Sequence, residues 1–327
     1  MKQFFLDIAR LWFFTFMWIS AAPFHLINRL LVSFTSAQKF PSNYRDMVIN
    51  FLTTTAPELA LNQLAPKYYD LETDASSELV YVDIGARGEL PDEVIKNKQL
   101  FKQIILCEGE PNEAKRLEGL GFDVIPNFIG KASERVFYDV IKNPGASGLF
   151  KPGKYGELDF LALYGGVNYS IEHQNFKEAK VKVKDAADAI SHFNLNKIDL
   201  LKIDTQGAEK EILESIFIGI NKKRLPRPLM INLEVMYTPY YHGVESGFKL
   251  LSFMIDQGYL VAELSDNHFR NGLPIWSDCL LIPDWNKTKN QAFLVENFES
   301  FQTLLCMHNK TPLFNFIQNS FKLRQLI

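Results

Sequence analysis

The sequence has few cysteines, and neither its cysteines nor its histidines stand in a metal-binding spacing. The three cysteines, Cys107, Cys279 and Cys306, lie far apart and are odd in number, which argues against a disulfide framework and favours a reducing compartment. The six histidines form no H-x-x-x-H or H-E-x-x-H pair. The sequence therefore predicts no metal site.

A surplus of charge of one sign is also missing. The 35 lysine and arginine residues nearly balance the 38 aspartate and glutamate residues, and the formal net charge is −3. Because the basic residues are scattered, no strong field attracts a polyanion, and nucleic acid is not expected as a partner. The 47% of apolar and 22% of charged residues are typical of a folded globular chain, and 327 residues suffice for one large domain with appendages.

The most apolar stretch, near the N-terminus, is short for a membrane span. No charged residue occurs from Leu11 to Asn28, but Pro23 leaves only 12 residues before it, whereas a span takes about 20. We expect residues 1–40 to form an apolar helical segment and residues 41–77 a lead-in and linker. The pattern leaves three arrangements open: a helix on a membrane surface, a helix packed on the protein or a partner, and a true span.

Strand-like and helix-like patterns alternate from residue 78 to residue 284. Such alternation predicts an α/β domain with a doubly wound, mostly parallel sheet and helices on both faces. The expected strands are Leu79–Ile84, Gln103–Cys107, Asp123–Pro126, Ile198–Ile203, Leu229–Val235, Tyr259–Leu264 and Ile275–Ile282. The expected helices are Pro91–Lys98, Asn112–Leu120, Ala208–Phe217 and Val244–Gln257.

Two other sections lie within or after this domain. Residues 130–184 are rich in glycine and aromatic residues and fit the period of neither element, so we expect loops that contact the substrate there. Residues 285–327 are expected to form amphipathic helices, over Gln291–Met307 and Leu313–Leu326, that pack on the domain or on a second copy of the chain.

The first motif is the glycine-containing turn after the first strand, Asp83-Ile-Gly-Ala-Arg-Gly88. A turn at the carboxyl end of a central strand is where open α/β sheets bind ligands. Gly85 and Gly88 would let a ligand approach the backbone with no Cβ in the way. Only G-x-x-G is present, and a dinucleotide fingerprint would read G-x-G-x-x-G.

Acidic residues follow two later strands. Glu108 ends the second strand about 20 residues after the glycines, where a carboxylate can accept the hydroxyl protons of a ribose, and Glu110 is the competitor for this role. Lys202 and Asp204 lie near the end of the buried strand Ile198–Ile203. Polar groups at the mouth of a sheet indicate a binding site, although Lys202 and Asp204 also fit a structural ion pair.

Taken together, these segments resemble the FkbM family of class I methyltransferases. Asp83-Ile-Gly-Ala-Arg-Gly88 is similar to the family's first cofactor motif, and the segment from Leu201 to Glu209 is similar to its signature after the fourth strand. Glu234, at the end of the fifth strand, also matches. Gln206 stands where the family frequently has Glu, and Glu108-Gly-Glu110-Pro stands where it commonly has Glu-Pro.

The resemblance implies a Rossmann-like seven-stranded sheet and S-adenosylmethionine as the cofactor. It implies cofactor binding by the residues Asp83, Gly85, Ala86, Gly88 and Glu108. It also implies methyl transfer to a hydroxyl of a sugar or another natural product. Asp204 is the candidate for the base that takes the hydroxyl proton or for orienting the acceptor, Lys202 for stabilising the developing oxygen charge, and Glu234 for completing the site. Acids grouped in this way could also hold a divalent cation, which the resemblance does not require.

Two other classes of function stay open on the sequence. An NAD-dependent oxidoreductase would use the same kind of turn, but the third glycine of its fingerprint is missing. A non-catalytic, membrane-associated binding protein would use the apolar N-terminus. Since S-adenosylmethionine is made in the cytosol, we expect the domain to be cytoplasmic, with possible attachment to the cytoplasmic face of a membrane.

Overall fold

The computed structural model describes residues 78–152, 175–237, 241–265, 269–270, 273–274 and 276–324. The expected N-terminal helical segment (residues 1–40) and the linker (residues 41–77) lie outside the described residues. Within the described ranges, no helix is both long enough and apolar enough to cross a membrane.

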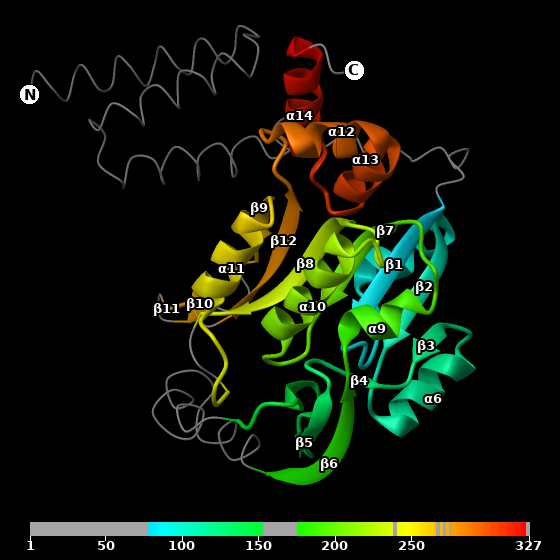
Figure 1. Ribbon diagram of the computed structural model, residues 1–327, viewed down its shortest axis with the longest axis vertical. Coiled ribbons are helices and arrows are strands. Elements are labelled where there is room, and N and C mark those ends of the chain that lie inside the picture. The colour runs from blue at the N-terminus through cyan, green and yellow to red at the C-terminus, as the bar shows by residue number, and fades with distance from the viewer. Residues whose placement is uncertain are drawn as a thin grey trace, which may run out of the picture. The chain divides into compact units, whose positions relative to one another are not determined.

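A seven-stranded sheet forms the centre of the fold (Figure 1). Its strands run in the order β3-β2-β1-β7-β8-β12-β9, and β12 is antiparallel to both of its neighbours. The doubly wound, mostly parallel sheet expected from the sequence is thereby confirmed. The strands are β1 (Leu79–Ile84), β2 (Phe101–Cys107), β3 (Asp123–Ile125), β7 (Ile198–Ile203), β8 (Pro228–Met236), β9 (Tyr259–Leu264) and β12 (Trp276–Pro283).

Helices cover both faces of this sheet and bury a core on each. Along β1, Val82 and Ile84 belong to one core while Leu79 and Tyr81 belong to the other. Because successive side chains of a strand point to opposite faces, a strand covered on both sides is largely apolar, and in β1 the one exception is Asp83. The first core is completed by α9 (Ala186–Ser191), α10 (Glu209–Asn221) and α11 (Gly247–Asp256). The second is completed by α5 (Asp92–Lys96), α6 (Pro111–Gly119), α12 (Thr288–Glu296), α13 (Phe298–Met307) and α14 (Thr311–Leu323).

A second, three-stranded sheet replaces part of the expected loop section. It contains β4 (Phe128–Ile129), β5 (Ser133–Val140) and β6 (Phe176–Lys184), in the order β4-β6-β5. Most side chains of β6 are exposed, and only Val183 is fully buried. From Lys180 to Lys184, lysine alternates with valine, which is the period of a half-covered strand, so the expectation of loops was wrong for β5 and β6. A short 3-10 turn, η2 (Pro144–Ala146), follows β5, and η1 (Lys98–Leu100) precedes β2.

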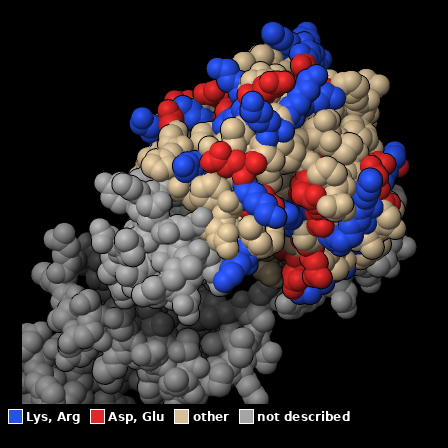
Figure 2. All heavy atoms as spheres, turned by 90° about the horizontal axis from the view of Figure 1, so that it is seen from below, with Lys and Arg blue, Asp and Glu red and all other residues tan. Residues whose placement is uncertain are grey.

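Two short strands follow β9 and precede β12 along the chain, and they pair with each other. They are β10 (Phe269–Arg270) and β11 (Leu273–Pro274). The three-stranded sheet of β4, β5 and β6 lies at the lower end of the described part in Figure 1. Figure 2 shows this end from below, and there acidic and basic side chains are interspersed instead of separating into fields of one sign.

Candidate active site

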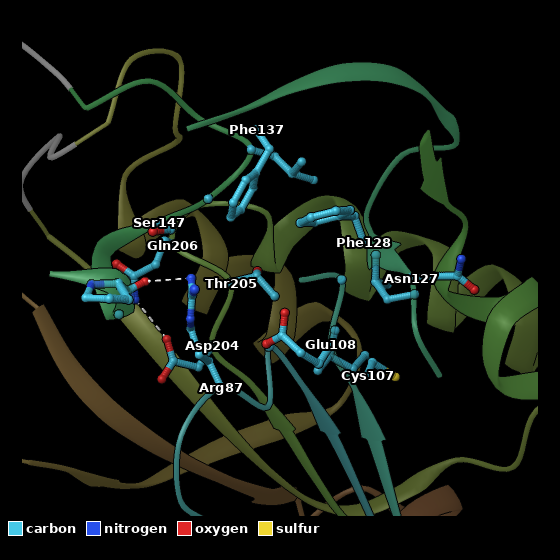
Figure 3. Close-up of a pocket in the computed structure, with 18 residues that line it drawn as sticks. Arg87, Cys107, Glu108, Asn127, Phe128, Phe137, Ser147, Asp204, Thr205 and Gln206 are labelled. Atoms are coloured by element: carbon cyan, nitrogen blue, oxygen red, sulfur yellow. Dashed lines mark hydrogen bonds between the residues drawn. The ribbon is translucent and has the colours of Figure 1, made fainter. Parts of the chain in front are cut away.

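A pocket lies where the order of the large sheet reverses. From β1 the chain moves outward through β2 and β3, and it then returns to the other side of β1 as β7. Ligands of open α/β sheets bind at such a switch point, beyond the carboxyl ends of the strands. The turns after β1, β2 and β7 line the pocket, together with residues 127–129, Phe137 of β5, residues 144–145 and residues 147–149 (Figure 3).

The backbone of the glycine turn is fully hydrogen-bonded within the protein. The N–H groups of Gly85 and Ala86 donate to the carbonyl oxygen of Cys107 at 3.0 and 3.1 Å, and the next N–H donates back to Gly85 at 2.9 Å. The N–H of Gly88 donates to the Glu113 carboxylate at 2.8 Å. A dinucleotide site needs such N–H groups for its pyrophosphate. This geometry therefore argues against the NAD-dependent alternative.

The structure gives Gly85 a role different from the expected one. A Cβ on Gly85 would lie 1.9 Å from the backbone oxygen of Asp204, and its φ is +88°. The protein itself thus requires a glycine there, whereas the sequence suggested space for a ligand. Gly88 also has a positive φ, of +87°, but an added Cβ would meet no atom within 4 Å. The side chain of Ala86 is buried in the second core and does not line the pocket.

Asp83 and Lys202 lie beneath the pocket and do not line it. Asp83 is 2% exposed, accepts a hydrogen bond from the Tyr81 hydroxyl at 2.7 Å, and has Lys202 Nζ at 3.4 Å. Lys202 Nζ is also 3.4 Å from the Asp204 carboxylate. Burial raises the pKa of Asp83 against the opposing effect of Lys202. Burial alone would lower the pKa of Lys202, but the two carboxylates outweigh it and raise it. Lys202 thus forms the ion pair that the sequence left open, and it joins the ends of β1 and β7.

The two acids after β2 have different environments. Glu108 is 7% exposed, lines the pocket, and accepts the N–H of Glu110 at 2.6 Å. Burial raises the pKa of Glu108, with Arg87 acting in the opposite direction. The Glu110 carboxylate caps helix α6 by accepting the N–H groups of Asn112 and Glu113 at 3.1 and 2.8 Å. A carboxylate already occupied by a helix N-terminus is a poor ribose acceptor, so Glu108 is the better candidate of the two.

Gln206 joins two acids at the other side of the pocket. Its side-chain nitrogen donates to Asp204 and to Glu234, both at 2.9 Å, and its oxygen accepts the Tyr241 hydroxyl at 2.7 Å. Burial, followed by the charge of Asp204 and other carboxylates, raises the pKa of Glu234 well above its usual value. Asp204 and Gln206 line the pocket, whereas Glu234 is connected to it through Gln206. In the described part of the chain, no three His, Cys, Asp or Glu side chains are grouped so that they could hold a metal ion.

Glu209 fixes the shape of the turn after β7. It is 4% exposed, and its carboxylate accepts the N–H groups of Thr205 at 2.9 Å and of Gly207 at 3.0 Å. Gln206 lies between these two residues with φ of +57°, a conformation that is strained for a residue other than glycine. The buried carboxylate therefore holds the backbone that presents the Gln206 side chain to the pocket.

Several pocket residues were not identified from the sequence. They are Arg87, Asn127, Phe128, Phe137 and Ser147. The rings of Phe128 and Phe137 lie 4.7 Å apart at an angle of 47° and form an apolar wall (Figure 3). Arg87 was visible inside the glycine motif, but the sequence gives no signal that its side chain turns into the pocket.

The aromatic segment after β8 was expected either to stack on a sugar or to form local core. Tyr241 is 2% exposed and bonds to Gln206 and to the carbonyl oxygen of Ala146. Tyr237 bonds to Ser277 at 2.7 Å and contacts the ring of Phe248. For these two tyrosines, the local packing interpretation is the one that the contacts favour. Residues 238–240 lie outside the described residues.

Comparison with known proteins gives one family match. The model of the methyltransferase FkbM domain matches residues 85–261, more than half of the chain. A search of curated proteins found no match.

Solved structures give distant likenesses. Magnesium protoporphyrin IX methyltransferase from Synechocystis PCC 6803, with bound SAM, is 9% identical, with 70% of this chain and 80% of that chain covered and a TM-score of 0.33. M. capricolum TrmK, in complex with S-adenosyl-homocysteine, is 12% identical, with 75% and 88% covered and a TM-score of 0.31. The precorrin-6y C5,15-methyltransferase of Geobacter metallireducens GS-15 is 15% identical, with 63% and 80% covered and a TM-score of 0.27. By its domain match, the chain belongs to the FkbM family of S-adenosylmethionine-dependent methyltransferases.

Proposed function

We propose that this methyltransferase acts on a hydroxyl oxygen of a small molecule or a glycan. The observation that carries the proposal is the pair of carboxylates on opposite sides of one pocket, Glu108 after β2 and Asp204 after β7. One acid is suited to hold the ribose of the cofactor, and the other to receive a proton from an acceptor. An oxygen acceptor needs such a proton receiver, because a neutral hydroxyl becomes a methyl ether only by losing its proton.

The residues of the pocket fit S-adenosylmethionine. Glu108 presents a carboxylate for the two ribose hydroxyls, and the apolar wall of Phe128 and Phe137 suits a nucleobase. When bound, the cofactor supplies an electrophilic methyl group on a sulfonium. In the balanced reaction, a bond forms between the acceptor oxygen and the methyl carbon while the carbon–sulfur bond breaks. The products are S-adenosylhomocysteine, a methyl ether and a proton.

Asp204 is the proposed receiver of that proton. Gln206 donates to one of its oxygens and Lys202 lies 3.4 Å from the other, so both neighbours fix the orientation of the carboxylate. Glu234 shares the Gln206 amide and is a positioning residue in this proposal. Asp83 and Lys202 support the site from below, and the proposed charge stabilisation by Lys202 would act through Asp204.

The first experiment identifies the acceptor by incubating cell extracts with the enzyme and a cofactor that carries a labelled methyl group. With the acceptor in hand, Asp204→Asn should lower kcat by about 100-fold or more, the usual contribution of a general base, while cofactor affinity measured by calorimetry stays within a few-fold. The matched control is Asp123→Asn, an exposed carboxylate on β3 outside the pocket. Normal turnover of Asp204→Asn, or label transferred to a nitrogen or carbon atom, would refute the proposal.

Attachment of the N-terminal segment to the cytoplasmic face of a membrane is a separate part of the proposal. It rests on the absence of charge from Leu11 to Asn28. The full chain should sediment with membranes, and alkaline carbonate should release it. A chain that starts at Phe40 should be soluble and bind cofactor. If the full chain is soluble and monodisperse without detergent, membrane attachment is wrong.

A further inference from the structure

The pocket contains one cation whose role the proposed reaction does not explain. Arg87 comes from the glycine turn, and in the view of Figure 3 its side chain lies between Glu108 and Asp204. Its guanidinium donates to the carbonyl oxygen of Pro144, on the far side of the pocket, at 3.1 Å. Within the described residues this hydrogen bond uses one of the five N–H donors of Arg87, and the charge of Arg87 opposes the rise that burial causes in the pKa of the neighbouring Glu108 and Glu113 carboxyl groups.

Most other hydrogen-bond donors of the described pocket residues are committed, and the side-chain amide of Asn127 is neutral. The N–H groups of the glycine turn bond to the protein itself. The Thr205 hydroxyl donates to Glu209, and the Gln206 amide donates to two carboxylates. Among the described residues that line the pocket, Arg87 is therefore the one cationic donor for an anionic group.

The charges of the pocket are the inverse of those of the cofactor. Among the described residues, the charged side chains on the pocket wall are Glu108, Asp204 and Arg87, which gives two anions and one cation. S-adenosylmethionine carries two cations, the sulfonium and the α-ammonium, and one anion, the α-carboxylate. A planar guanidinium binds a carboxylate through two parallel hydrogen bonds, and this pairing is among the strongest in proteins.

We propose that Arg87 binds the α-carboxylate of the cofactor and so selects ligands that carry an intact amino-acid group. This inference rests on the cofactor assignment. It gives the arginine of the glycine motif a binding role that the backbone of the turn, bonded within the protein, does not fulfil.

The test compares two ligands that differ only in the carboxylate, S-adenosylmethionine and decarboxylated S-adenosylmethionine, by calorimetry. The wild-type protein should bind the first about 10- to 100-fold more tightly, the range expected for a hydrogen bond to a charged group. Arg87→Met should remove this difference by weakening only S-adenosylmethionine, and Arg87→Lys should keep part of it. The control is Arg116→Met, because Arg116 donates to the Gly88 carbonyl on the same turn but does not line the pocket.

Binding of decarboxylated S-adenosylmethionine also reports whether each variant keeps an intact pocket. If Arg87→Met weakens both ligands equally, Arg87 only holds the loop at Pro144 and the inference is wrong. The inference is also wrong if the wild-type protein binds the two ligands equally tightly. It is wrong as well if Arg116→Met changes the ratio of their two affinities as much as Arg87→Met does. Should the wild-type protein bind neither ligand, the cofactor assignment itself would fail.

Discussion

Replacement of Gln206 by glutamate tests the arrangement of acids beside the pocket most directly. The amide nitrogen of Gln206 lies 2.9 Å from an oxygen of Asp204 and 2.9 Å from an oxygen of Glu234. Gln206→Glu keeps the size and shape of the side chain but turns this donor into a third carboxylate oxygen. Gln206→Met is the uncharged comparison: it removes the same two hydrogen bonds and also the one that the Gln206 oxygen accepts from the Tyr241 hydroxyl at 2.7 Å.

The expected loss of stability has two parts. Two hydrogen bonds to carboxylates contribute about 3 kcal/mol together, and we reduce this to about 2 kcal/mol because Asp204 exposes 36% of its side chain to screening solvent. Gln206→Met loses this part at every pH, and Gln206→Glu loses it when its carboxyl group is ionised, because the protonated group still has one O–H donor. In Gln206→Glu the clustered carboxylates also raise one pKa in the folded state, and each unit of that shift corresponds to about 1.4 kcal/mol.

The sign of the pH dependence follows from proton binding. A carboxyl group whose pKa is raised by folding binds its proton more tightly in the folded than in the unfolded protein, so stability falls as the pH rises above the unfolded value of about 4.3. The difference in stability between the two variants should therefore be constant below about pH 4. Between there and pH 8, Gln206→Glu should lose about 2 to 3 kcal/mol relative to Gln206→Met, for a shift of about two units.

Urea unfolding at pH 5, 6, 7 and 8 measures this difference without adding salt that would screen the charges. If the free energies of unfolding of Gln206→Glu and Gln206→Met change with pH in parallel, the reasoning is refuted. They would mean that the third carboxylate turns away from the other two or is fully solvated.

Three further predictions concern single positions. Gly85→Ala should lower the free energy of unfolding by about 3 kcal/mol or more, because its Cβ would lie 1.9 Å from a backbone oxygen. Gly88→Ala should lower it by only about 1–2 kcal/mol, through its positive φ. Thermal unfolding in which Gly88→Ala is the less stable variant would contradict this. Glu108→Gln should weaken S-adenosylhomocysteine binding by about 10-fold. Glu110→Gln should leave this binding unchanged and should lower the free energy of unfolding by about 1 kcal/mol through the lost helix cap. If calorimetry shows that Glu110→Gln and not Glu108→Gln weakens binding, Glu110 is the residue that binds the ribose. Ellman's reagent should react quickly only with the partly exposed Cys306 thiol, since burial raises the pKa of the other two cysteine thiols, and rapid reaction of all three would disagree with the burial of the sheet.

The sequence predicted the central strands of the large sheet because both of their faces are covered. In β1 all six residues are buried, and the run is apolar except for Asp83. β6 is exposed along most of its length, but from Lys180 to Lys184 its lysines alternate with valines, which is the period of a half-covered strand. The small sheet was missed because the whole glycine- and aromatic-rich section was assigned to loops, although this short strand pattern lies within it.

The sequence could predict that a residue lies at the pocket when that residue directly follows a strand of the large sheet. Glu108 and Asp204 follow the ends of β2 and β7, and parallel strands bring these ends to one edge of the sheet. The pocket contacts of Arg87 were not predictable. They depend on a turn whose shape is set by hydrogen bonds to Cys107, and on Pro144, 57 residues further along the chain.

The place of β12 in the sheet has a consequence for the order of events during synthesis. β12 is the last strand of the large sheet in the sequence, yet it lies between β8 and β9 and pairs with both. Until the ribosome has made Trp276–Pro283, the backbone groups at the edges of β8 and β9 that pair with β12 have no partner strand. Open edges are templates for pairing with other chains, and long-range strand insertion is slow. A nascent chain of this protein therefore carries open, aggregation-prone strand edges until β12 has been translated. We expect its dependence on chaperones to be greatest before that point.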